Sequence, residues 1–288
     1  MRKEHKWEVR TVQTAVVTQA VKEMCIEANH QLSQDMQEAF VRAAQGEKAP
    51  LGKQILEQLS DNLEIAHKEQ IPICQDTGMA VVFLEVGQDV HFEGGWLEDA
   101  VNEGIRQGYK EGYLRKSVVA DPVYRENTQD NTPGILHYQI VPGDKVKITV
   151  APKGFGSENM SRVFMLKPVD GLEGIKNAVL QAVADAGPNA CPPMVVGVGI
   201  GGTFEKCALM AKQALLRPVS AHSDLAWARE MEEELLERIN RTGIGPGGLG
   251  GRMTAFAVHI LTYPTHIAGL PVAVNICCHV NRHVSREI

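Results

Sequence analysis

Chemically active side chains gather in the segment Pro72–Gly78 (PICQDTG), which places a thiol, an amide, a carboxylate and a hydroxyl next to one another. The segment lies between a charged helical pattern that ends near Lys68 and an apolar run, Met79–Val86, that predicts a strand. A loop at such a junction leaves its side chains accessible while the strand fixes their position. The alternative is a turn with one buried cysteine, because cysteine outside disulfides is often a core residue.

Cys191 and one of the pair Cys277 and Cys278 are the other thiols expected in loops. Cys191 precedes a double proline, which holds the backbone out of a helix, and the pair Cys277 and Cys278 follows an apolar strand pattern. Cys25 and Cys207 fall inside helical apolar patterns and are predicted to be core residues.

Three thiolates from distant loops would suit a [4Fe-4S] cluster with one iron lacking a protein ligand. That iron could act as a Lewis acid toward a hydroxyl or a carboxylate. The absence of C-x-x-C spacing argues against a zinc finger or ribbon. Spacing alone leaves open a second interpretation, in which the three cysteines are unrelated buried residues.

Candidate anion contacts surround these loops. A predicted strand runs into Lys153–Asn159 (KGFGSEN), where glycines would let backbone amides turn toward an anion and the lysine adds charge. Arg115 and Lys116 follow a helical pattern over 96–112, and such basic pairs also cap helix ends. The segment Gly197–Gly202 matches G-x-G-x-x-G, a dinucleotide fingerprint. No acidic residue ends a second strand about twenty residues later, so nucleotide binding is a remote alternative.

Hydrophobic periodicity predicts an α+β fold in one domain of residues 1–288. Helices are expected over about 1–70, with an apolar stripe through Val12, Val16, Ala20 and Met24. Small mixed sheets that carry the loops are expected over about 71–288, and 135–141 and 145–150 read as a hairpin turned at Pro142–Asp144.

Composition limits the possible partners. The 288-residue chain has a formal net charge of -6 and no basic tract, which argues against nucleic-acid binding. It contains no apolar run long enough to cross a membrane and no signal-peptide pattern at its start. We therefore expect a cytoplasmic protein with reduced thiols.

Four segments in register carry a family resemblance. The chain resembles the class I, iron–sulfur fumarate hydratases and the related L-tartrate dehydratases, in their cluster-binding alpha-subunit part. The matching segments are Cys74–Gly78, Lys153–Asn159, Ala190–Pro193 with Gly197–Gly202, and Asn275–His279 followed by Arg282 and His283.

The resemblance implies roles for individual residues. It implies a [4Fe-4S] cluster on Cys74, Cys191 and Cys278, since the family places the ligand directly before the histidine of a Cys-His-x-x-Arg-His run. It also implies that Asp76 and His266 are catalytic. The residues that it places at the substrate are Gln75, Arg115, Lys153, Gly154 and Gly156.

The resemblance also implies a partner. The family's second part carries a Lys-Gly-x-Thr-Thr type segment, which this sequence lacks, so we expect a separate beta subunit to complete the site in a heterotetramer or larger assembly. The expected reaction is the interconversion of the dicarboxylates malate and fumarate. L-tartrate dehydration is the nearest alternative, and a subunit without a cluster is a third.

Overall fold

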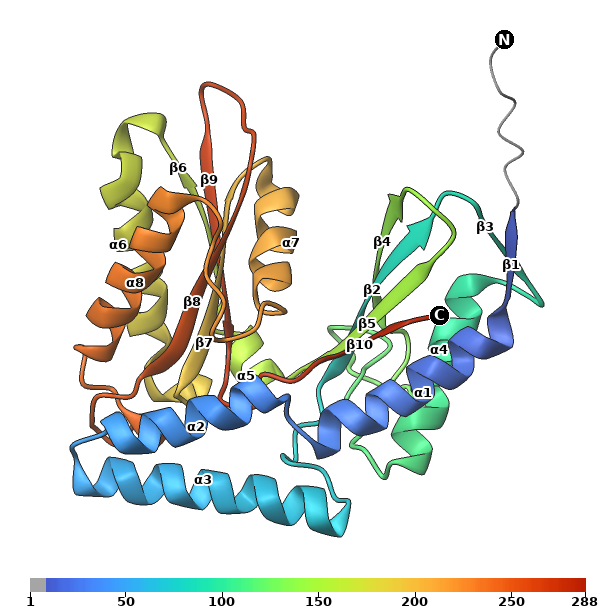
Figure 1. Cartoon of the computed structure of the whole chain (residues 1–288), viewed down its shortest axis with the longest axis horizontal. Coiled ribbons are helices and arrows are strands. Elements are labelled where there is room, and N and C mark those ends of the chain that lie inside the picture. Colours follow the sequence, from blue (N-terminus) through green and yellow to red (C-terminus); the bar gives the residue numbers. More distant parts are fainter. Residues whose placement is uncertain (1–8) are drawn as a thin grey trace. The chain divides into compact units, whose positions relative to one another are not determined.

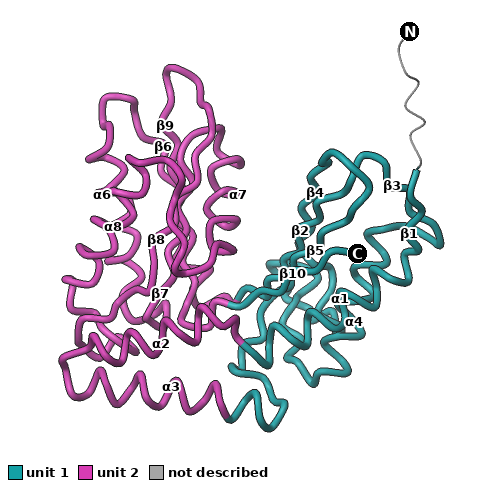
Figure 2. Tube along the Cα trace, viewed as in Figure 1, with its two compact units in different colours: residues 1–31, 65–153, 282–288 teal, residues 32–64, 154–281 magenta. Residues whose placement is uncertain are grey.

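The computed structural model describes residues 9–288, where the chain forms two compact units (Figure 2). Unit 1 contains the described residues up to Gln31, together with Ile65–Lys153 and Arg282–Ile288. Unit 2 contains Leu32–Glu64 and Gly154–Asn281. That residues 1–288 fold as one domain stays a prediction, and a single cooperative unfolding transition of the chain would support it.

The helices expected over about 1–70 and over 96–112 are present in the described residues, except that Val12, expected on the helical stripe, lies in strand β1 (Arg10–Gln13). None of the helices in residues 9–288 is long and apolar enough to cross a membrane. Their bounds are α1 (Thr14–His30), α2 (Gln34–Gly46), α3 (Pro50–Glu69), α4 (Leu97–Glu111), α5 (Phe155–Glu158), α6 (Gly171–Ala186), α7 (Phe204–Ala214) and α8 (Ala226–Asn240).

The strands of the described residues form three small sheets, which confirms the α+β prediction. Two sheets have four strands, in the orders β10-β5-β2-β4 and β6-β9-β7-β8, and β1 pairs with β3. The bounds are β1 (Arg10–Gln13), β2 (Met79–Gly87), β3 (Val90–Glu93), β4 (Ile135–Val141), β5 (Val146–Lys153), β6 (Arg162–Leu166), β7 (Met194–Gly201), β8 (Ala255–Tyr263), β9 (Leu270–Cys277) and β10 (Val284–Glu287).

The predicted hairpin between β4 and β5 is wrong. Strand β2 lies between them, parallel to β4 and antiparallel to β5. Most residues of β2 are buried, so pairing on both of its edges satisfies backbone groups that water cannot reach. The turn at Pro142–Asp144 instead passes the end of β2, where the amides of Gln88 and Asp89 donate to the carbonyls of Val141 and Gly143.

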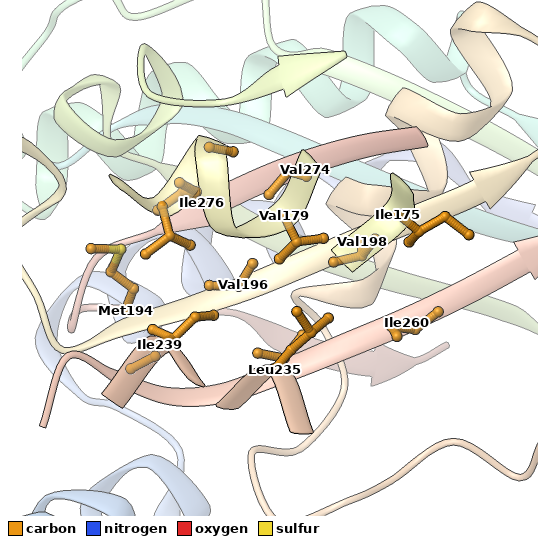
Figure 3. Close-up of a cluster of buried hydrophobic side chains, with 14 of the residues drawn as sticks. Ile175, Val179, Met194, Val196, Val198, Leu235, Ile239, Ile260, Val274 and Ile276 are labelled. Carbon is orange, nitrogen blue, oxygen red and sulfur yellow. The ribbon is translucent and has the colours of Figure 1, made fainter. Parts of the chain in front are cut away.

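Unit 2 has its core on one face of the sheet β6-β9-β7-β8. Helices α6 and α8 cover that face and α7 covers the other (Figure 1). Strand β7 is buried at every position, because it is an inner strand with helices over both faces. Figure 3 shows Val179 of α6 and Leu235 of α8 gathered with Val196 and Val198 of β7.

The glycine pattern on β7 is explained by helix packing. A Cβ on Gly197 would lie 2.1 Å from the carbonyl oxygen of Ala211, and one on Gly199 would lie 2.1 Å from that of Cys207. Both carbonyls belong to α7, so the glycines allow that helix to approach the strand closely. The amide of Gly202 donates to the carbonyl of Pro264, so the chain itself occupies the turn. The dinucleotide interpretation therefore loses its basis in the sequence.

A buried histidine in β8 gives unit 2 a pH dependence. His259 is buried, and its Nδ1 lies 3.1 Å from the carbonyl oxygen of Ala214. Burial, and then the charge of Arg217, lower the pKa of His259 from 6.5 to about 4. As the pH falls, the unfolded chain gains a proton first. The contribution to stability is therefore complete above pH 6.5 and is lost toward pH 4, on the order of 3 kcal/mol.

His259→Asn tests this pH dependence, because asparagine keeps a donor near the Nδ1 position but does not titrate in this range. Urea unfolding of the full chain at about pH 7.5 and about pH 5 should show a smaller loss of stability in the variant. If both proteins lose the same unfolding free energy between the two pH values, His259 is not the group responsible.

Candidate functional site

The six cysteines separate by exposure. All lie in the described part of the chain and none forms a disulfide there. The predicted core residues Cys25 and Cys207 are buried, and so is Cys277. Cys74 and Cys278 are partly exposed and Cys191 is exposed, so the accessible thiols are the three predicted cluster ligands.

Cys74 lies in a short loop of unit 1 between α3 and β2. Its Sγ is 3.4 Å from the amide nitrogen of Asp76, which donates to it, and 3.4 Å from Oε1 of Gln75. Oδ1 of Asp76 accepts a bond from the amide of Gly78 at 2.9 Å. Hydrogen bonds to a cysteine sulfur are among the features that tune iron–sulfur sites. The loop thus holds the thiol and the carboxylate close together.

Two residues absent from the predicted site hold this loop. The Tyr109 hydroxyl lies 2.8 Å from the carbonyl oxygen of Thr77 and 2.9 Å from that of Gly78. The Thr77 hydroxyl accepts from the amide of Arg115 at 2.9 Å and donates to its carbonyl at 3.1 Å. Unit 1 therefore places Arg115 beside the loop of Cys74, and its predicted role as a substrate contact stays a prediction.

Lys153 ends strand β5 opposite Met79, also within unit 1, and is 6% exposed. Gly78 has φ +77°, and a Cβ there would lie 2.7 Å from the amide nitrogen of Lys153, so only glycine fits. Sequence reasoning found both residues, but it did not reveal that they touch.

The expected glycine loop is mostly a short helix. Gly154 precedes α5 and accepts a bond from the Ser157 hydroxyl at 3.3 Å. Glu158 ends α5 and ties it to the rest of unit 2, through Nζ of Lys212 at 2.6 Å and the amide of Asn275 at 3.0 Å. A Cβ on Gly156 would lie 3.7 Å from the carbonyl oxygen of Asn189, which places this glycine near the Cys191 loop.

Cys191 and Cys278 are brought together in unit 2. Cys191 has the left-handed backbone conformation φ 51°, ψ 66°. Its carbonyl oxygen accepts from the backbone amide of His279 at 3.2 Å and from Nδ1 of the same residue at 2.9 Å. The residue after Cys278 therefore binds Cys191 directly.

His266 lies away from these thiols. Cys191 precedes the start of β7, and Gly201 at the far end of β7 pairs with Tyr263. The β8–β9 turn that holds His266 is therefore at the opposite end of the sheet, about 25 Å away for a strand of this length (Figure 1). There His266 lines a pocket of about 490 Å³ with Trp227 and Tyr263. Unit 2 thus does not bring His266 to Cys191 and Cys278, and its catalytic role stays a prediction.

The donor set fits the implied [4Fe-4S] cluster in its chemistry. Three accessible thiols on loops are the ligands that such a cluster takes, and Cys74 already accepts an amide hydrogen bond. Cys74 belongs to unit 1 and the other two cysteines belong to unit 2. No three His, Cys, Asp or Glu side chains among residues 9–288 are arranged to hold a metal ion.

Comparison with known proteins places the chain in a family. The sequence profile of the fumarate hydratase (Fumerase) family matches residues 18–287, so the chain belongs to that family. The chain is accordingly a hydro-lyase, and the predicted family resemblance is confirmed.

The relatives are named as alpha subunits. A putative L(+)-tartrate dehydratase subunit alpha of Methanocaldococcus jannaschii is 40% identical over 279 residues, which cover 94% of this chain and 97% of that protein. The L(+)-tartrate dehydratase subunit alpha of Escherichia coli K12 is 32% identical over 251 residues, covering 86% and 82%. These names agree better with the alternative substrate, L-tartrate, than with malate and fumarate.

Proposed function

We propose that the chain is the alpha subunit of a [4Fe-4S] hydro-lyase that removes water from a four-carbon 2-hydroxydicarboxylate, with L(+)-tartrate as the first candidate substrate. The observation that carries the proposal is the difference in exposure among the cysteines, because only the three predicted ligands are accessible. The names of the relatives support tartrate.

Cys74, Cys191 and Cys278 would hold the cluster, which when bound supplies a Lewis acid for the leaving hydroxyl. Around Cys74, the positive side chains of Arg115 and Lys153 would bind substrate carboxylates through charge-assisted hydrogen bonds. Gln75, in the loop of Cys74, is exposed and would offer an amide to a substrate hydroxyl. The amides of Gly154 and Gly156 are further proposed contacts.

Asp76 is the proposed general acid and base on this chain. The amide of Gly78 holds the carboxylate through Oδ1, and the carboxyl group would exchange a proton with the substrate. Asp76→Asn keeps the shape and removes this capacity, so turnover should fall about 100-fold or more while iron content stays unchanged. Retained turnover in this variant would assign the proton transfer to another residue.

A beta subunit is part of the proposal, because the relatives are named as alpha subunits. We propose that this second chain supplies the remaining base and completes a heterotetramer or a larger assembly. Malate and fumarate are the second candidate substrates, supported by the description of the matching family.

Kinetics of the anaerobically purified complex with its beta subunit would test the proposal. We expect iron and sulfide in the protein and a higher kcat/KM for L(+)-tartrate than for malate or fumarate. A preference for malate would move the assignment to fumarate hydratase. A complex without iron that still assembles would support a subunit with no cluster and overturn the proposal.

A further inference from the structure

The segment Cys278–His283 makes contacts that the proposed function does not use. Its middle is anchored in unit 2, where Val280 is buried and the side-chain amide of Asn281 donates to the carbonyl of Leu215 at 2.9 Å. The segment also carries one predicted ligand, Cys278, and two side chains that bind backbone carbonyls in the loops of Cys191 and Cys74.

The first of these side chains is His279, within unit 2. A carbonyl only accepts hydrogen bonds, so Nδ1 of His279 carries the proton that it shares with Cys191. The ring also packs edge-on against Phe40 of α2, with ring centroids 6.2 Å apart, which limits its rotation. A left-handed backbone is strained for a cysteine, and the two bonds from His279 oppose its relaxation.

The second side chain is Arg282, within unit 1. It is 4% exposed, and its Nη2 donates to the carbonyl oxygen of Asp76 at 2.5 Å. Its Nε and Nη1 are buried and have no hydrogen-bond partner among the described residues. An apolar residue of similar volume often stabilises a protein at least as well as an incompletely bonded buried charge. Stability alone therefore gives little reason for an arginine here.

We propose that Cys278–His283 is the positioning element of the site: His279 fixes the loop of Cys191 in unit 2, and Arg282 fixes the loop of Cys74 in unit 1. The roles of the cysteines rest on the proposed function. The hydrogen bonds that fix the two loops are separate from the proposed function, because each joins two residues of this chain. Within each unit, the segment thus holds a loop that carries another predicted ligand.

Hydrogen exchange of the full, cluster-free chain tests whether His279 fixes the loop of Cys191. In His279→Ala, backbone amides in 187–193 should exchange about tenfold faster, as expected for the loss of one hydrogen bond, while the rest of unit 2 is unchanged. His279→Asn carries an amide nitrogen near the Nδ1 position and should restore slow exchange. Unchanged exchange in the alanine variant, or faster exchange throughout unit 2, would overturn the proposal for His279.

Arg282→Met tests whether Arg282 fixes the loop of Cys74. Exchange in 74–78 should become faster while the free energy of unfolding stays the same or rises, a combination that a purely stabilising arginine would not give. Arg286→Met is the matched control, because Arg286 pairs with Glu23 and Glu27 on the surface of unit 1 and should leave 74–78 unchanged. A general loss of stability in Arg282→Met without a local change would contradict the assignment.

Iron retention separates the two proposals. In complexes purified anaerobically, both His279→Ala and Arg282→Met should release iron to a chelator faster than the wild type. Wild-type protein without iron would overturn the proposed function and leave the exchange results valid. Wild-type protein with iron, and variants that exchange and release iron at the wild-type rate, would overturn the positioning role alone.

Discussion

Cys278→Ser is expected to abolish iron binding and dehydratase activity, whereas the neighbouring Cys277→Ser should retain both. Cys277 ends β9 and is 4% exposed, paired with Val195 of β7. Cys278 lies outside the strand, is partly exposed, and directly precedes the histidine that binds Cys191. Of the two thiols, only that of Cys278 is thus placed to bind iron outside the core. A serine hydroxyl is a much poorer ligand for iron than a thiolate.

The paired variants also separate ligand loss from unfolding. Cys277→Ser puts a hydroxyl into the apolar core and should cost about 1–3 kcal/mol of unfolding free energy, with iron retained. Cys278→Ser should leave thermal unfolding of the cluster-free chain nearly unchanged. Iron and sulfide analysis after anaerobic purification, with turnover of L(+)-tartrate by the complex, measures both effects. The reverse pattern, with iron lost only in the Cys277 variant, would show that the ligand has been misassigned.

Exposure of the cysteines could be predicted to a useful degree. Cys25 and Cys207 lie within helical apolar patterns, and the structure buries both. The double proline after Cys191 predicts a non-helical loop, and the structure has one. The choice between Cys277 and Cys278 came from a family pattern, because strand alternation alone does not mark where β9 ends.

The contacts that assemble the loops had no signal in the sequence. Thr77 and Arg115 are separated by 38 residues, and His279 and Cys191 by 88. Each pair is joined by hydrogen bonds to a backbone group, which any residue type offers. Tyr109 was visible only as one apolar position in a helix, so its bonds to Thr77 and Gly78 could not be foreseen.

Helix phase was only partly predictable. The expected stripe on α1 used a spacing of four residues, which rotates about 40° per step around a helix of 3.6 residues per turn. Ala20 and Met24 are buried as expected, but Val16 is 49% exposed and Val17 is buried in its place. The position of His266 could not be predicted from the sequence either. Only the pairing of β7 with β8 shows at which end of the sheet His266 lies.

Glu47 is a buried carboxylate whose replacement should strongly lower the free energy of unfolding. It is 1% exposed and follows α2. Its Oε1 accepts from the amides of Lys48 and Ala49, and its Oε2 from those of Arg252 and Met253, all between 2.8 and 2.9 Å. Burial alone would raise the pKa of Glu47, but these four amides together lower it. The carboxylate is therefore stable as an anion inside unit 2.

Glu47→Gln should lower the free energy of unfolding by about 3 kcal/mol, measured by urea denaturation. Glutamine has one acceptor oxygen, so its amide group would face two backbone donors and leave them buried without partners. Glu38→Gln on α2 is the matched control. Glu38 is exposed, and its contacts with Arg42 at 3.6 Å and with the side-chain amide of Gln34 at 3.1 Å are on the surface, so its loss should change stability by less than about 0.5 kcal/mol.

Glu47→Gln should also weaken the retention of iron by the proposed cluster site. Arg252 and Met253 directly follow the glycine-rich loop Thr242–Gly251. The amide of Gly247 in this loop donates to the carbonyl of Pro192, one residue after Cys191, at 2.9 Å. Releasing the loop from Glu47 removes support from the Cys191 backbone, so Glu47→Gln should also lose iron to a chelator faster than Glu38→Gln. A Glu47 variant that is destabilised yet keeps iron as tightly as the control would show that the Cys191 loop is held without the Thr242–Gly251 loop. In that case His279 would be its principal support.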